Sequence, residues 1–245
     1  MSCPPARLAL LVALALLAVG CGSDEDSKDT GDGGAKKSKP AKAPGSVTST
    51  TEALTGECRK TQEPKPRSGD KASKPKAKLD AAKAATAVVV TTCGEFTIAL
   101  DAKRAPTTAS SFASLARQGF YDGLTFHRVS AGFVIQGGDP LANGKGGPGY
   151  KVVEPPPSDT RYPRGAVAMA KGPLEEPGTS GSQFFVVTAE DASAPPFSLP
   201  AEYALVGKVA KGLDVIQRIG SLQADPQTEK PVTPVVIQQV KIQEG

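Results

Sequence analysis

The sequence is poor in the residues that most often carry enzyme chemistry. It has no tryptophan and a single histidine, and aromatic residues make up 5% of its 245 residues. A site that needs two imidazoles is therefore excluded. The single histidine, His127, alternates with Arg128 on a strand-like run, so the two side chains point to opposite faces. We expect His127 to be a buried, hydrogen-bonded scaffold residue rather than a catalytic one.

The sequence also lacks an apolar run long enough to cross a bilayer. The run at 8–19 is about a dozen residues, whereas a spanning helix needs about 20. It predicts a signal peptide over residues 1–20. The residues before Cys21 resemble the lipobox of bacterial lipoproteins, which implies a lipidated Cys21 and an extracytoplasmic protein anchored to a bacterial membrane by lipid. The alternative is an ordinary secretory signal with an incidental cysteine.

Residues 22–84 contain no phenylalanine, tyrosine or tryptophan. Such a segment buries too little apolar surface to offset its ordering entropy, so residues 21–84 are predicted to form a disordered tether. The segment 22–84 carries 14 Lys and Arg against 10 Asp and Glu, a balance of +4, whereas residues 85–245 carry 14 against 15, a balance of −1. We therefore expect no nucleic-acid partner for the folded part. The tether is either a solvated spacer or a weak contact for anionic lipid headgroups.

The four cysteines separate into two groups. Cys3 leaves with the predicted signal peptide and Cys21 is the predicted lipidation site. Cys58 and Cys93 form an even pair outside the cytoplasm, where disulfides persist. We predict a disulfide between them, and the alternative is two free thiols.

Residues 85–245 are predicted to form one folded domain. Helical spacing predicts helices over 106–119 and 213–219. Strand-like runs occupy 88–92, 96–101, 125–129, 133–136, 166–170, 183–188, 203–209 and 235–243. Many short strands with glycine and proline turns and only two helices indicate a mainly β, closed or nearly closed architecture.

The segment 126–139 is the most informative one. It holds one arginine, a glycine break, apolar residues, a glutamine and a Gly-Gly-Asp exit, but no nucleophile, paired carboxylates or metal-ligand cluster. A site of this kind works by positioning and polarising its substrate, and we expect neither a metal nor a cofactor. Residues 144–149 match G-x-G-x-x-G, but Pro148 and the strand-like run after it exclude the helix that a dinucleotide site requires.

The segment 126–139 resembles the signature of the cyclophilin peptidyl-prolyl cis-trans isomerases. Further segments resemble that family in the same order, at 105–112, 119–124, 169–170, 181–185 and 206–216. The resemblance implies an eight-stranded antiparallel closed barrel capped by two α-helices, and we expect a monomer. Side chains fill the interior of a barrel of this size, so the substrate groove is expected on its outside.

The resemblance also implies roles for individual residues. Arg128 takes the position of the catalytic arginine, which donates a hydrogen bond to the prolyl nitrogen of a twisted amide. The implied substrate-binding residues are Phe133, Val134, Phe185 and Leu199 in the proline pocket, Gln136 beside Arg128, Ala170 and Lys171 through their backbone groups, Gln183 in support of the groove, and Tyr203 at its edge.

The chain departs from the family pattern at three places. Tyr203 stands where well-known members have histidine. Ser198 stands where many have tryptophan, which argues against strong cyclosporin binding, although Phe197 can substitute if the loop shifts by one residue. The loop at 171–182 is longer than in short members and carries two extra acids, which is expected to alter the residues accepted before proline.

Three functions remain open from the sequence. The leading one is an isomerase that acts on proline-containing segments of exported proteins. The second is a catalytically weak chaperone module of the cell envelope that binds proline-containing peptides. The third is a purely structural envelope protein.

Overall fold

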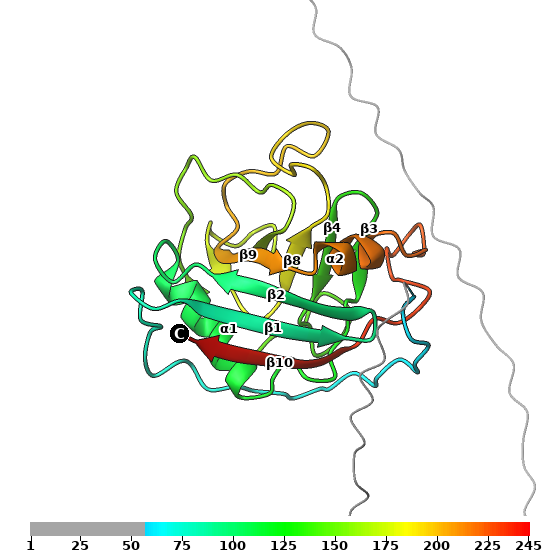
Figure 1. Ribbon diagram of the computed structural model, residues 1–245, viewed down its shortest axis with the longest axis horizontal. Coiled ribbons are helices and arrows are strands. Elements are labelled where there is room, and N and C mark those ends of the chain that lie inside the picture. Colours follow the sequence, from blue (N-terminus) through cyan, green and yellow to red (C-terminus); the bar gives the residue numbers. More distant parts are fainter. Residues whose placement is uncertain (1–56) are drawn as a thin grey trace, which may run out of the picture. The chain divides into compact units, whose positions relative to one another are not determined.

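The computed structural model describes residues 57–245, so the predicted signal peptide and the lipidation site Cys21 lie outside the described residues. Its strands and helices, in chain order (Figure 1), are β1 (Ala85–Thr91), β2 (Gly94–Leu100), α1 (Pro106–Arg117), β3 (Arg128–Ser130), β4 (Val134–Gly137), β5 (Val152–Val153), β6 (Ala166–Met169), β7 (Thr179–Ser180), β8 (Phe184–Val187), β9 (Leu205–Lys211), α2 (Leu213–Gly220) and β10 (Ile237–Glu244). No helix within this range is long and apolar enough to cross a membrane.

Eight strands form one antiparallel sheet in the order β10-β1-β2-β9-β6-β8-β4-β3, and β5 pairs with β7 separately. The expected closed barrel is not confirmed, because the ladder is open between its edge strands β3 and β10. The edges meet at one isolated bridge, Thr125 with Val236, and through flanking backbone bonds such as Phe126 N–H to the Val235 carbonyl at 2.9 Å. The strand expected at 125–129 is therefore split into this bridge and the three-residue β3.

The strands β4, β6 and β8 are buried on both faces. Their outer face therefore carries apolar side chains on which a site outside the sheet can be built. Successive side chains of a strand point to opposite faces. Ile135 and Phe184 belong to the main core inside the sheet, whereas Val134, Ala168 and Phe185 belong to a second apolar cluster on the outer face. The sheet thus carries a main core on one side and a smaller apolar floor on the other.

The helix α1 has the predicted position and begins at Pro106, whose fixed φ suits the first turn of a helix. No side chain of the helix caps its N-terminus. Instead, the Glu154 carboxylate accepts hydrogen bonds from the Thr107 and Thr108 backbone N–H groups at 2.9 and 2.7 Å. These bonds satisfy N–H groups that a helix leaves without intrahelical partners, and the negative charge suits the positive end of the helix dipole.

Residues 57–84, which we call the strap, lie against the domain (Figure 1), and the expectation that they form a disordered tether is wrong for this part. Arg67 donates to the carbonyls of Asp122 and Phe120 at 3.1 and 2.5 Å, and its guanidinium lies over the Phe120 ring. Leu79 is 8% exposed and joins the main core. The strap has no apolar periodicity because it docks through scattered anchors rather than through one continuous face.

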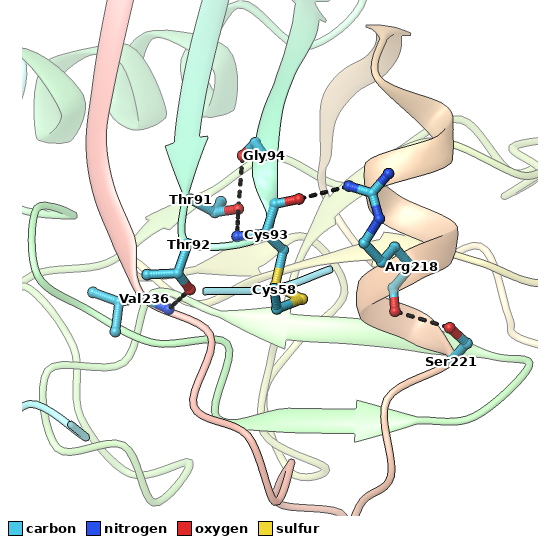
Figure 2. The surroundings of a disulfide bond; sticks show 8 residues. All are labelled: Cys58, Thr91, Thr92, Cys93, Gly94, Arg218, Ser221 and Val236. Carbon is cyan, nitrogen blue, oxygen red and sulfur yellow. Dashed lines mark hydrogen bonds between the residues drawn. A yellow bond between two sulfur atoms is a disulfide. The ribbon is translucent and has the colours of Figure 1, made fainter. Parts of the chain in front are cut away.

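The structure contains the predicted disulfide between Cys58 and Cys93 (Figure 2). Cys93 lies fully buried in the turn between β1 and β2, and its carbonyl accepts a hydrogen bond from Arg218 of α2 at 2.7 Å. The backbone N–H of Cys93 donates to the Thr91 hydroxyl at 3.0 Å. The start of the strap is therefore fixed covalently to a turn that α2 already holds.

Candidate active site

The structure gathers almost all of the predicted site residues around one pocket of about 270 Å³ on the outer face of the sheet. The pocket is lined by Arg128, Phe133, Val134, Gln136, Ala170, Lys171, Phe185, Leu199 and Tyr203. The remaining predicted residue, Gln183, lies in a neighbouring cavity of about 690 Å³ that shares Gln136, Ala170 and Lys171 with the first. The two cavities therefore adjoin each other at these three shared residues, and together we call them the groove.

Arg128 begins β3 at the rim of the apolar pocket, with its side chain 34% exposed. Its Nη1 donates to Gln136 Oε1 at 3.2 Å, because the two residues face each other in the register of β3 and β4. Its Nε donates to Glu229 Oε2 at 2.5 Å. Among residues 57–245, Nη2 has no hydrogen-bond partner. The guanidinium is thus held on two sides and leaves one nitrogen for a bound peptide.

A chain of side-chain amides runs from Arg128 into the neighbouring cavity. Gln136 Nε2 donates to Gln183 Oε1 at 3.0 Å, and Gln183 Nε2 donates to the Gly146 carbonyl at 2.9 Å. Each amide uses its oxygen on one side and its nitrogen on the other. This fixes the orientation of Gln136, which agrees with the expected role of Gln183 as a support for the groove.

Aromatic rings form the walls of the apolar pocket. Phe185 and Tyr203 meet edge to face with ring centroids 5.4 Å apart. Behind them, the Tyr162 hydroxyl donates to the Tyr203 carbonyl at 2.8 Å and accepts from its N–H at 3.0 Å. Burial raises the pKa of Tyr162 to about 12, so this hydroxyl stays protonated and keeps its donor at neutral pH. Tyr203 is therefore fixed by its backbone.

Ser198 stands where many family members have tryptophan, and the aromatic residue before it packs on a residue of the pocket. Phe197 stacks on Phe133 with ring centroids 4.3 Å apart and planes 13° from parallel. Ser198 does not line the pocket. Phe197 does not line the pocket either, but its ring packs against the lining residue Phe133, so the substitution of Phe197 for the tryptophan stays a prediction.

Lys171 lies in the groove as a nearly buried cation, with its side chain 5% exposed. Its Nζ lies 3.1 Å from Glu202 Oε2, donates to the Glu175 carbonyl at 3.2 Å, and lies 5.7 Å from the Tyr203 ring centroid. The backbone of Ala170 was expected to bind the substrate, but its N–H group already has a partner. Its N–H donates to the Gln183 carbonyl at 2.9 Å and is therefore not available to a substrate.

The far wall of the larger cavity is a loop at 144–149 that two separate elements support. Asp139, 1% exposed, accepts hydrogen bonds from the Leu141 and Gly144 N–H groups at 2.7 and 2.6 Å. On the other side, the strap residue Ala72 donates its N–H to the Pro148 carbonyl at 2.9 Å. The acid of the Gly-Gly-Asp motif thus has a structural role, and the strap supports this wall.

The single histidine directly precedes β3 and is buried, as expected, with 9% of its surface exposed, and it does not line the pocket. The expectation that it is hydrogen-bonded is not confirmed: neither ring nitrogen meets the full geometry of a hydrogen bond to a described residue, although the backbone of Thr125 lies close enough to act on the ring. Burial lowers the pKa of His127, and nearby Arg128 acts in the same direction while Asp139 opposes it. His127 is therefore a neutral packing residue at neutral pH.

Sequence reasoning missed Glu229, whose carboxylate also accepts a hydrogen bond from the Ser130 hydroxyl at 2.5 Å. Burial acts to raise the pKa of Glu229, but the hydrogen bonds from Ser130 and Arg128 outweigh it and hold the pKa below its usual value. The carboxylate is thus charged beside the guanidinium. Glu229 is separated from Arg128 by 101 residues, and nothing in its local sequence signals the contact.

Comparison with known proteins gives a consistent result. The family model of the cyclophilin-type peptidyl-prolyl cis-trans isomerases matches residues 86–242. A peptidyl-prolyl cis-trans isomerase of Helicobacter pylori is 40% identical over 141 residues, which cover 56% of this chain and 82% of that protein. A probable peptidyl-prolyl cis-trans isomerase B of Mycobacterium leprae is 35% identical over 201 residues, which cover 72% of this chain and 65% of that protein.

A solved structure agrees with the sequence relatives. It is a cyclophilin-type peptidyl-prolyl cis-trans isomerase of Cryptosporidium parvum, determined in the presence of the dipeptide Ala-Pro. It is 29% identical to this chain and superposes with a TM-score of 0.58, covering 65% of this chain and 99% of its own. The part that superposes is thus essentially the whole of that protein.

Proposed function

Because this chain belongs to the cyclophilin-type peptidyl-prolyl cis-trans isomerases (EC 5.2.1.8), we propose that it accelerates X-Pro rotation with Arg128 as the polarising group and the pocket beside it as the proline site. The observation that carries the proposal is the position of the Arg128 guanidinium, held by Gln136 at the rim of an apolar pocket.

The reaction suits a site without a nucleophile. The C–N bond of an amide has partial double-bond character, and its rotation barrier is about 18–20 kcal/mol. Uncatalysed X-Pro exchange therefore takes tens to hundreds of seconds. Twisting the amide removes its conjugation and localises a lone pair on the prolyl nitrogen. A fixed donor directed at that nitrogen binds the twisted state better than either planar state, which is the requirement for catalysis.

Arg128 has the properties of such a donor. A guanidinium is always charged and holds its N–H groups in a rigid plane. With Nε directed at Glu229 and Nη1 at Gln136, the Nη2 group is the nitrogen left for the substrate. Phe133, Phe185 and Leu199 lie at the same pocket and supply an apolar surface for the proline ring.

The size of the required rate acceleration shows how much Arg128 and the apolar pocket must each contribute. Acceleration to milliseconds requires about 10⁴- to 10⁵-fold, or roughly 5.5–7 kcal/mol. One hydrogen bond to a charged group contributes about 1.5–3 kcal/mol. Arg128 alone is therefore insufficient, and the apolar pocket must exclude water and anchor the ring while the preceding residue rotates.

The larger cavity supports a proposal about the residues that precede proline. It shares Gln136 and Ala170 with the proline pocket, and Glu175 and Lys151 lie in its lining. The Glu175 carboxylate pairs with Lys151 and accepts the Gly172 N–H at 2.8 Å. The loop at 171–182 is therefore held by its own backbone and by Lys151 where it lines this cavity. We propose that this cavity receives the side chains before proline.

We propose further that the protein acts outside the cytoplasm as a lipid-anchored monomer on a bacterial membrane, and that its clients are exported proteins. The sequence over 1–20 with Cys21 supports the signal peptide and the lipid anchor. The Cys58–Cys93 disulfide supports an oxidising compartment, where such bonds persist.

The test is a protease-coupled assay with a chromogenic proline tetrapeptide and the full-length chain in detergent. Arg128→Ala is expected to lower kcat/KM by about 10- to 150-fold, which is the loss of one hydrogen bond to a charged group. The matched control is Arg117→Ala, since Arg117 is 49% exposed, pairs with Glu244 and lies away from the pocket. Peptide binding without any acceleration by the wild-type chain would instead identify a weak binding module.

A further inference from the structure

The loop before β10 delivers a carboxylate to the back of the guanidinium at the active site. Glu229 Oε2 accepts the Arg128 Nε hydrogen at 2.5 Å, and Glu229 Oε1 accepts the Ser130 hydroxyl at 2.5 Å. Both oxygens are therefore used on β3, and two residues of the same strand hold the carboxylate in one orientation. Glu229 does not line the proline pocket.

The backbone of this loop holds Glu229 in place independently of its side chain. The Val129 N–H donates to the Glu229 carbonyl at 2.7 Å, and the Glu229 N–H donates to the Asp225 carbonyl at 2.8 Å. The Asp225 carboxylate accepts the Gln227 and Thr228 N–H groups at 3.0 and 2.8 Å, which closes the turn. Glu229 itself has a φ of 56°, an uncommon conformation for a residue other than glycine.

The two partners of Arg128 differ in what else they can touch. Gln136 lines the pocket and can contact a bound peptide, whereas Glu229 contacts the guanidinium from behind. An exposed arginine otherwise samples many rotamers, so a carboxylate on Nε restricts the direction in which Nη2 points. Holding the donor in its productive geometry before the substrate twists removes reorganisation from the catalytic step.

We propose that Glu229 is a positioning residue for isomerisation, which fixes the Arg128 fork so that its free nitrogen meets the twisted amide. This inference rests on the proposed role of Arg128. It places an essential part of the site on the loop before β10, far in sequence from the signature segment.

The test compares the full-length chain with Glu229→Ala, Glu229→Gln and a matched control, using NMR exchange spectroscopy on a proline peptide over a range of peptide concentrations. Glu229→Ala is expected to lower kcat about 5- to 20-fold with KM changed less than about twofold, since only the twisted state needs the fixed fork. Glu229→Gln keeps an oxygen for Nε and is expected to stay within about threefold of the wild type.

The control is Glu244→Ala. Glu244 is 39% exposed against 37% for Glu229 and also pairs with an arginine, Arg117, but it lies at the end of β10. It is expected to leave kcat unchanged. Unfolding midpoints of the two alanine variants should shift by similar small amounts, because exposed ion pairs contribute little to stability. A purely structural role for Glu229 would lower the midpoint without lowering kcat.

A double variant tests whether Glu229 acts through Arg128. In an Arg128→Ala background, the further change Glu229→Ala is expected to have no additional effect on kcat, since its influence acts through the guanidinium. An equal loss in both backgrounds would overturn the inference. An impaired Arg128→Ala with a fully active Glu229→Ala would overturn it while leaving the role of Arg128 intact. A fully active Arg128→Ala would instead refute the proposed mechanism itself.

Discussion

Loss of the Cys58–Cys93 disulfide is expected to destabilise the domain strongly while leaving catalysis nearly unchanged. The bond joins residues 35 apart in sequence and fixes the strap to the turn between β1 and β2. Closing a loop of that length removes conformational entropy from the unfolded chain worth about 4 kcal/mol. For a domain of this size, about 2–4 °C is lost per kcal/mol, so Tm is expected to fall by roughly 8–16 °C.

The assay is thermal unfolding of the full-length chain, followed by circular dichroism with and without reductant. The double variant Cys58→Ala with Cys93→Ala serves as the control, and its Tm should not respond to reductant. The kcat/KM at 25 °C should stay within about twofold of the wild type, because neither cysteine lines the pocket.

Two results would refute this reasoning. One is a pair of free thiols in the unreduced protein. The other is a strap that becomes sensitive to protease after reduction while the Tm of the domain stays the same. The second result would mean that the strap unfolds by itself, and that its closure contributes nothing to the cooperative unit.

Two further predictions concern pH and backbone geometry. The free energy of unfolding should fall as pH decreases below about 6.5, because the unfolded state binds a proton at the ordinary histidine pKa whereas burial lowers the pKa of His127 in the fold. Urea unfolding from pH 8 to pH 5 measures this slope, and an identical slope in His127→Gln would contradict it. Gly138→Ala should cost more stability than Gly144→Ala. Both glycines have a φ of 82°, but an added Cβ at Gly138 would lie 2.5 Å from the Ser182 carbonyl and one at Gly144 would meet nothing within 4 Å. Equal losses in urea unfolding of the two variants would refute this assignment.

Local patterns in the sequence predicted most of the regular elements. The spacing of Ala109, Phe112, Ala113 and Ala116 after Pro106 predicts a helix, and α1 ends at Arg117, two residues before the predicted stop at Gly119. The strands around the turn at Cys93 and both strands of the signature segment lie within a few residues of their predicted positions. These predictions succeed because periodicity and turn residues act between neighbours in the chain.

The contact between the two edges of the sheet and the docking of the strap were not predictable in this way. The meeting of Thr125 with Val236 depends on how far the twisted sheet curls, which no local pattern encodes. The strap lacks periodic apolar residues, and Arg67 docks on backbone carbonyls. A backbone carbonyl is present at every residue, so its use as an acceptor leaves no mark in the sequence.

The sequence by itself determined the family and the mainly β architecture, and it predicted the cysteine pair and the residues that lie around the pocket beside Arg128, because segments that resemble the family follow one another in the family's order over 105–216. Gln136 was expected beside Arg128, but only the tertiary structure decided that a second group, Glu229, also holds the guanidinium. Glu229 is 101 residues away from Arg128 and reaches it because β3 is an edge strand beside the loop before β10. Contacts between distant segments depend on topology and side-chain geometry, and these are settled only when the whole chain folds.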